Sequence, residues 1–114
     1  MAAFEHDGDV LIVVLGPRLD HAAIPALQRR TREALDEGVR ALVVDMTDLE
    51  LLPSNGVGFL LALAQDVRAQ GGRLAIAAAH GSALGTLRTM GVADVFPMHE
   101  SRAAAVLGVR SPSP

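Results

Sequence analysis

Short runs of aliphatic and β-branched residues recur along the chain, at positions 10–15, 41–46 and 74–78. Glycine lies close to each run, and uninterrupted apolar runs of about four to eight residues are typical of strands covered on both faces. We therefore predict three buried strands. A further segment, Phe4–His6, is predicted to pair with the first run as a hairpin arm across the turn pair Asp7-Gly8.

The segments between these runs carry apolar residues every three or four positions, the spacing of a helix that packs one face on a sheet. In the first, Asp20 is a candidate N-cap, Pro25 suits the first turn and Gly38 ends the helix. The second helix follows the loop 53–56 and ends at Gly71. Inward positions are predicted at Ile24, Leu27, Ala34 and Leu35 in the first helix and at Val57, Leu60, Leu61, Ala64 and Val67 in the second.

The last third of the chain predicts a short helix over 82–90 with Leu84 and Leu87 inward, an extended edge segment over 95–98, and a helix capped by Ser101. Strands alternating with helices favour a mostly parallel sheet. We therefore predict an α/β fold with one domain over residues 1–109. We expect a mixed, mostly parallel sheet of four to five strands with about four helices packed against it, and a disordered tail at 110–114.

Composition excludes several classes of function. The 114 residues include no cysteine, so disulfides, thiolate metal sites and thiol nucleophiles are ruled out. The net charge of −3 and the three aromatic residues argue against direct nucleic-acid binding, which uses a basic face and stacking platforms. The basic cluster at 29–32 is followed at once by acidic residues, as on a solvated helix face.

The same composition predicts no metal, no cofactor and no membrane insertion. The four histidines, at 6, 21, 80 and 99, lack metal-ligand spacing. The first seven residues have no positively charged stretch, and the apolar runs are far shorter than the ~18 residues of a membrane span. We therefore expect a cytoplasmic protein.

No catalytic motif stands out in the sequence. Gly56-Val57-Gly58 lacks both the Gly-Lys-Ser/Thr of a P-loop and the third glycine of a dinucleotide fingerprint. Four residues could supply acid or base groups, but nothing gathers them around a nucleophile: Asp20, His21, Asp45 and Asp48. The sequence therefore favours a binding module over an enzyme.

Two strand-to-helix junctions carry the remaining candidate chemistry. Asp20 lies in the first, at 16–21, and Ser54 and Asn55 lie in the second, at 53–58. Binding sites of α/β sheets form at the carboxyl ends of the strands. We therefore expect both junctions to lie on one edge of the domain.

Four segments resemble sequence features of one family. Gly16–Asp20 is similar to a Gly-x-Leu-Asp turn. Val43–Leu49 is similar to a central strand and the residues that follow it. Pro53–Leu60 is similar in part to an Asp-Ser-Ser/Thr-Gly-x-Gly loop, and Met90–Pro97 to a Gly-Leu-x-x-Val-Phe segment. In this order, over roughly residues 10–107, they resemble the STAS family and specifically its anti-sigma factor antagonists.

The resemblance implies a site and a partner. The family's phosphorylated serine corresponds to Ser54, and the turn aspartate that supports phosphorylation and binding corresponds to Asp20. Pro53 stands where the family has aspartate, and Asn55 where it has a second serine or threonine. The phosphorylating partner is a serine kinase that is itself an anti-sigma factor.

The implied function is that of a non-enzymatic, bacterial transcription regulator, a monomer or weak dimer, that switches partners on phosphorylation of Ser54. The residues expected to bind the partner are Asp20, Ser54, Asn55, Gly56, Val57, Gly58 and Phe59. The resemblance also allows an alternative. The chain would then be a STAS scaffold or accessory subunit, in a stress-signalling assembly or beside a transporter, without phosphorylation.

Asp20, Ser54 and Phe59 also have purely structural interpretations, and Leu63 shares that of Phe59. Ser54 could be a helix N-cap, which stabilises a helix by ~1 kcal/mol, and the same applies to Asp20. Phe59 and Leu63 lie off the predicted inward stripe of their helix. They either cover the rim of the core or form an apolar contact patch beside the Ser54 loop.

Overall fold

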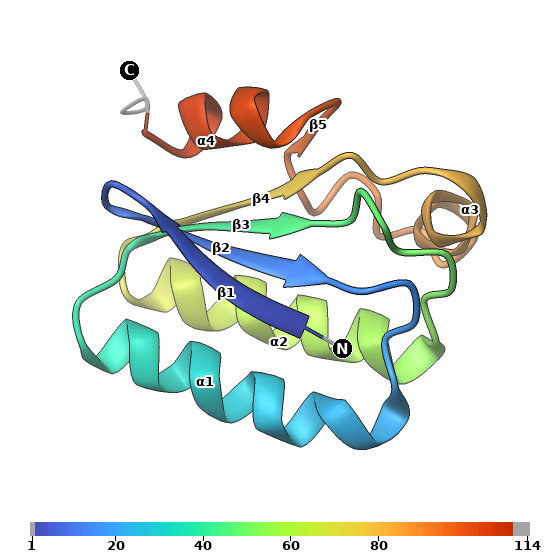
Figure 1. Cartoon of the computed structure of the whole chain (residues 1–114), viewed down its shortest axis with the longest axis horizontal. Helices are drawn as coiled ribbons and strands as arrows, with labels where there is room; N and C mark the ends of the chain where they lie inside the picture. The colour runs from blue at the N-terminus through green and yellow to red at the C-terminus, as the bar shows by residue number, and fades with distance from the viewer. Residues whose placement is uncertain (1, 111–114) are drawn as a thin grey trace.

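A five-stranded mixed sheet in the order β1-β2-β3-β4-β5 lies at the centre of the computed structural model, which describes residues 2–110 (Figure 1). β1 is antiparallel to β2, and the later strands run parallel to their neighbours. The strands are β1 (Ala2–Asp7), β2 (Val10–Leu15), β3 (Ala41–Asp45), β4 (Arg73–Ala77) and β5 (Met98–His99). The predicted α/β fold is confirmed.

Helices cover both faces of this sheet because each parallel crossover requires one. α1 and α2 lie side by side on one face, α4 lies on the other, and α3 lies beyond the carboxyl ends of the strands (Figure 1). The helices are a 3₁₀ turn (His21–Ala23), α1 (Ile24–Asp36), α2 (Ser54–Ala69), α3 (Gly81–Thr89) and α4 (Arg102–Arg110). The predicted order of elements is confirmed.

The apolar runs of the central strands divide their side chains between two cores. Leu11 and Val13 of β2 pack with α1 and α2, whereas Val10 and Ile12 pack with α4. Both sets are buried because successive side chains of a strand point to opposite faces. The uninterrupted hydrophobic pattern of these strands therefore indicates helices on both faces of the sheet.

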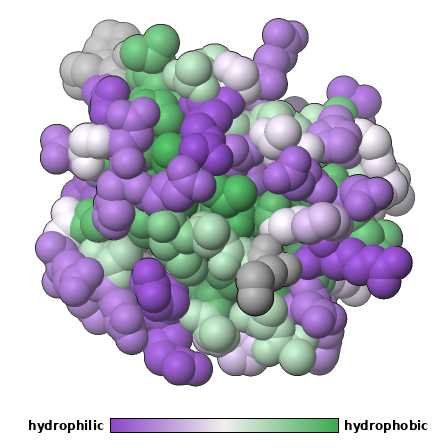
Figure 2. Space-filling view, in the orientation of Figure 1, coloured by the Kyte–Doolittle hydropathy of each residue, from purple (hydrophilic) through white to green (hydrophobic). Residues whose placement is uncertain are grey.

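β1 is an edge strand whose alternate residues meet different layers. Phe4 is half-buried on the α1 side, with the Arg30 guanidinium 4.6 Å from its ring centroid, a cation–π contact. On the face seen in Figure 2, apolar residues gather near the middle of the view, with hydrophilic residues on either side. The turn into β2 consists of Gly8 and Asp9, since Asp7 already pairs with Val10. The predicted turn was therefore one residue early, and Gly8 supplies the positive φ of +60°.

α2 buries a wider face than its periodicity predicts. Phe59 and Leu63 are only 2% and 3% exposed. The reason is that α1 packs beside α2 on the same face of the sheet, so residues off the sheet-facing stripe enter the common core. The interpretation of Phe59 and Leu63 as an exposed contact patch is therefore wrong. Leu61, predicted inward, is half-buried.

Smaller corrections concern β4 and α3. Ala78 was predicted to end the strand, but it has φ +59° and lies outside β4. In α3, Leu87 is buried as expected, whereas Leu84 is half-buried and Ala83 takes the second inward position.

The carboxyl-terminal region follows its predicted elements with two exceptions. The extended segment predicted over 95–98 begins only at Met98, because Val95 lies in a turn and β5 is Met98–His99. The Ser101 hydroxyl caps α4 by accepting a hydrogen bond from the Ala104 amide at 3.1 Å. Arg110 was assigned to a disordered tail, but it is the last residue of α4. Its Nη2 donates to the Asp7 carbonyl at 2.7 Å and to the Asp7 carboxylate at 3.0 Å. The remaining predicted tail, 111–114, lies outside the described residues.

A buried carboxylate joins the sheet to α4. Asp45, 3% exposed, accepts hydrogen bonds from the Thr47 amide at 2.9 Å, the Thr47 hydroxyl at 2.6 Å and Arg102 Nε at 2.8 Å. Arg102 Nη1 also donates to Glu5 at 2.9 Å. Burial by itself raises the pKa of Asp45, but the hydrogen bonds from Thr47 and Arg102 outweigh it and hold that pKa below its ordinary value.

The substitution Asp45→Asn should destabilise the protein at neutral pH by about 1–3 kcal/mol, because it removes the charge that Arg102 faces. The pKa of Asp45 lies below 3.8 in the folded protein. Its contribution is therefore complete above that value and is lost as the pH falls through the lower folded-state value. Urea unfolding at pH 7 and pH 3 should show the difference between wild type and variant shrinking in acid. An equal difference at both pH values would contradict this assignment.

Candidate functional site

The two junctions meet at the carboxyl edge of the sheet. The carbonyl oxygen of Pro17 accepts hydrogen bonds from the amides of Glu50 at 2.8 Å and Leu51 at 3.3 Å. The side-chain amide of Asn55 donates to Nδ1 of His21. The expectation that both junctions share one edge is therefore confirmed, and we call the surface of 16–21 and 50–58 the Ser54 edge.

Ser54 is the first residue of α2 and is exposed. The N-cap is Pro53, in an extended conformation, and no side chain caps the helix. The Pro53 carbonyl accepts from the amides of Gly56 at 2.9 Å and Val57 at 3.3 Å. The N-cap interpretation of Ser54 is therefore wrong. Its hydroxyl lies at the positive end of the helix dipole, where negative charge is favoured.

Asp20 is exposed at the turn that precedes α1. It occupies the N-cap position of the 3₁₀ turn but makes no side-chain capping bond. The α1 N-cap itself is Ala23. The carboxylate of Asp20 therefore adds negative charge to the Ser54 edge without a local capping role.

Of the seven residues expected to bind a partner, three are buried: Gly56, Val57 and Phe59. A Cβ at Gly56 would lie 2.8 Å from Leu19 Cδ2 and 2.9 Å from Leu52 Cδ1, so this glycine allows α2 to approach the core closely. These three residues thus support the edge from beneath, which corrects their assignment to the contact surface. Gly58 is exposed, with no atom within 4 Å of a Cβ placed there.

The apolar group that the edge does expose is Leu51. Its side chain is 56% exposed, whereas its neighbour Leu52 is buried. Leu51 is held by its backbone bridge to Arg18. From the sequence, Phe59 was the candidate for this role because it lies off the predicted inward stripe of its helix, and Leu51 was not considered.

A third loop, missed in the sequence, also supports the edge. The Ser82 hydroxyl at the start of α3 donates to the Glu50 carbonyl, and His80 Nε2 lies 2.8 Å from the Thr47 carbonyl oxygen. These partners are more than thirty positions apart in the chain, so no local spacing could reveal them. The loop that carries Ser54 is therefore fixed from two sides.

The four acid and base groups considered for catalysis differ in their surroundings, and Asp20 and His21 are exposed at the Ser54 edge. Asp45 is occupied by Thr47 and Arg102, while Asp48 is exposed. Among residues 2–110, no group of three or more histidine, aspartate and glutamate side chains could hold a metal ion. Within the same residues, no helix combines the length and the apolar character that a membrane crossing requires.

The STAS domain family model matches residues 1–105. The chain belongs to the STAS family. The segments that resemble that family thus occupy the elements described above: the turn before α1, the strand β3, the amino end of α2 and the segment before β5.

Several solved structures share this fold. An anti-sigma factor antagonist from Mycobacterium paratuberculosis is 24% identical with a TM-score of 0.85, over 97% of this chain and 94% of that one. The unphosphorylated antagonist SpoIIAA is 18% identical with a TM-score of 0.86 over the whole of both chains, and the phosphorylated form from Bacillus gives 0.75. The murine anion transporter Slc26a9 is 16% identical with a TM-score of 0.73. It matches 95% of this chain, which spans 19% of the transporter.

The two glycines at the amino end of α2 should respond oppositely to alanine. Gly56→Ala should lower the free energy of unfolding by about 1–3 kcal/mol, since the new methyl overlaps Leu19 and Leu52. Gly58→Ala should raise it by about 0.5–1 kcal/mol, because alanine favours the helix and meets open space. Chemical denaturation of both variants checks this, and equal effects would show that α2 does not sit as described.

Proposed function

We propose that this STAS protein is a non-enzymatic anti-sigma factor antagonist. Its unmodified form binds an anti-sigma factor kinase through the Ser54 edge, and phosphorylation of Ser54 releases that partner. The observation that carries the proposal is the position of Ser54. Its hydroxyl is exposed on the first turn of a long helix, on an edge that hydrogen bonds fix on two sides.

The chemistry of the edge fits a protein partner. Leu51 supplies an exposed apolar group, and the polar groups of Asp20, His21 and Ser54 lie close by in the two junctions. An apolar centre surrounded by polar groups is the usual anatomy of a protein–protein contact. The Ser54 edge therefore offers a partner both contact area and orientation.

A phosphate at Ser54 would act on the interface and leave the fold intact. It would add about −1.5 to −2 charges at a helix amino terminus, which the helix dipole favours by ~0.3–1 kcal/mol. A partner that buries the neutral hydroxyl would instead face a desolvated, unpaired charge, at a cost of several kcal/mol. A loss of that size abolishes a micromolar complex.

A second candidate follows from Pro53 and Asn55. Pro53 caps α2 where the family has aspartate, and Asn55 is hydrogen-bonded to His21 where the family has serine or threonine. A part of the anion transporter Slc26a9 has the same fold as this chain. The alternative is therefore a scaffold or accessory subunit that binds through the same edge without phosphorylation.

Incubation with ATP and each serine-kinase anti-sigma factor encoded in the same genome should add one phosphate, measured by intact mass. Ser54→Ala should abolish the addition, and Ser101→Ala, at another exposed serine, should preserve it. The absence of phosphate with every kinase, or its persistence in Ser54→Ala, would refute the switch.

Ser54→Glu should weaken binding of the anti-sigma factor at least about tenfold, equivalent to ~1.4 kcal/mol. The matched control is Gln65→Glu, which adds the same charge at an exposed position of α2, three turns away, and should leave the affinity unchanged. Isothermal titration calorimetry measures both. A Ser54→Glu protein that binds like wild type would favour the scaffold over the switch.

A further inference from the structure

β4 has an open edge at the end of the molecule opposite Ser54. β5 pairs only with the last two residues of β4, Ile76 with Met98 and Ala77 with His99. The chain that precedes β5 turns away, since the Val95 amide bonds to the Val92 carbonyl. The amino-terminal half of β4, from Arg73 to Ala75, therefore has no strand beside it on the β5 side.

The main chain at this open edge can form ladder hydrogen bonds. On the β5 side, the amides of Ile76 and Ala78 donate to the carbonyls of Pro97 and His99 at 2.9 and 2.8 Å. On the β3 side, the Arg73 amide donates to the Arg40 carbonyl at 2.7 Å. By this alternation, the N–H and C=O of Leu74 point outward, past the end of the β5 ladder.

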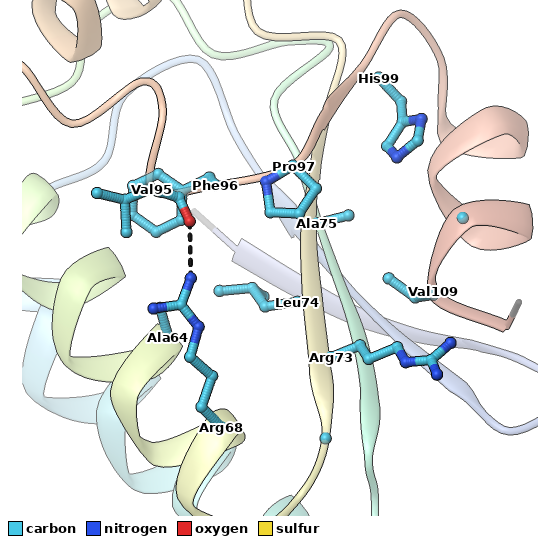
Figure 3. Close-up of a pocket in the computed structure, with 12 residues that line it drawn as sticks. Ala64, Arg68, Arg73, Leu74, Ala75, Val95, Phe96, Pro97, His99 and Val109 are labelled. Carbon is cyan, nitrogen blue, oxygen red and sulfur yellow. Dashed lines mark hydrogen bonds between the residues drawn. The ribbon is translucent and has the colours of Figure 1, made fainter. Parts of the chain in front are cut away.

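A groove of about 270 Å³ runs along this edge between α2 and α4 (Figure 3). Its floor includes Leu74 and Ala75. One wall is α2, the other is α4, and Pro97 closes the end nearest β5. The space therefore lies in line with β5, at the position where a longer β5 would run.

The charges of the groove select its occupant. None of its lining residues is acidic, and Arg68 and Arg73 both line it. Arg68 comes from the α2 wall, where its Nη2 donates to the Val95 carbonyl at 2.8 Å, and Arg73 extends on the α4 side (Figure 3). Within residues 2–110, no carboxylate forms an ion pair with either arginine. The two guanidinium groups also repel the same edge of a second copy.

We propose that this groove binds an extended segment of a partner protein that carries two adjacent acidic residues. The segment extends the line of β5 and pairs with the main chain of Leu74, in the manner of strand addition to a sheet edge. Successive side chains of a strand point to opposite faces. One acidic side chain therefore reaches Arg68 on the α2 side, and the next reaches Arg73 on the α4 side. This inference is independent of the function of Ser54.

The test uses two pentapeptides of identical composition, acetylated and amidated at their ends. In Val-Glu-Glu-Val-Val the acidic residues are adjacent, whereas in Val-Glu-Val-Glu-Val they point to the same face. Each is titrated into ¹⁵N-labelled full-length protein and followed by amide chemical shifts. The adjacent-acid peptide should shift the Leu74 amide and bind at least roughly threefold more tightly, as expected for one additional exposed ion pair.

Two variants distinguish binding in the groove from non-specific electrostatic attraction of the peptide. Arg73→Gln should weaken the adjacent-acid peptide roughly threefold. Arg88→Gln, which removes an exposed arginine of α3, should leave binding unchanged. No shift at Leu74, or equal affinity of the two peptides, would overturn the proposal. Equal shifts with free glutarate would identify a pocket for small anions instead, and concentration-dependent shifts without peptide would identify a second copy as the occupant.

Discussion

The amino end of α2 is fixed between neighbouring loops, and the rest of the functional account depends on this constraint. The Pro17 carbonyl accepts hydrogen bonds from the amides of Glu50 and Leu51, in the segment that joins β3 to α2. The side chain of Asn55 is hydrogen-bonded to His21. Because these contacts use main-chain groups and the Asn55 amide, the Ser54 hydroxyl stays at the surface. A modification of Ser54 can therefore change which partner binds without changing the fold of the protein.

The two ends of α2 serve different surfaces. Its amino end carries Ser54 at the carboxyl edge of the sheet, and its last turns carry Arg68 beside the open half of β4. Between them, the buried face of the helix packs on the sheet and on α1. The same rigid element thus separates the edge at which we propose binding that depends on modification from the groove at which we propose binding through fixed positive charge.

Sequence patterns were sufficient for the fold because its determinants are local. The apolar runs of β2 and β3 and the glycines that follow α1 and α2 need no knowledge of distant contacts. The burial of Phe59 could not be predicted in this way, since it depends on α1 lying beside α2. The prediction that Ser54 caps α2 was wrong for a local reason, because Pro53 takes the extended N-cap position.

The meeting of the two junctions at one edge was predictable from the sequence, but the surface that they form there was not. The resemblance to the STAS family indicated Asp20 and Ser54. The exposure of Leu51, the Asn55–His21 bond and the support from Ser82 arise from pairings across more than thirty residues. The Asp45–Arg102 pair is a similar case, since 57 positions separate its members.

The most direct test of the central claim is the free energy of unfolding of Ser54→Glu protein, measured by urea denaturation beside wild type. A solvent-facing helix terminus accepts the added charge, so the two values should agree to within about 1 kcal/mol. A loss of about 3 kcal/mol or more would contradict the account, because the charge would then be acting on the fold and not on the docking of a partner.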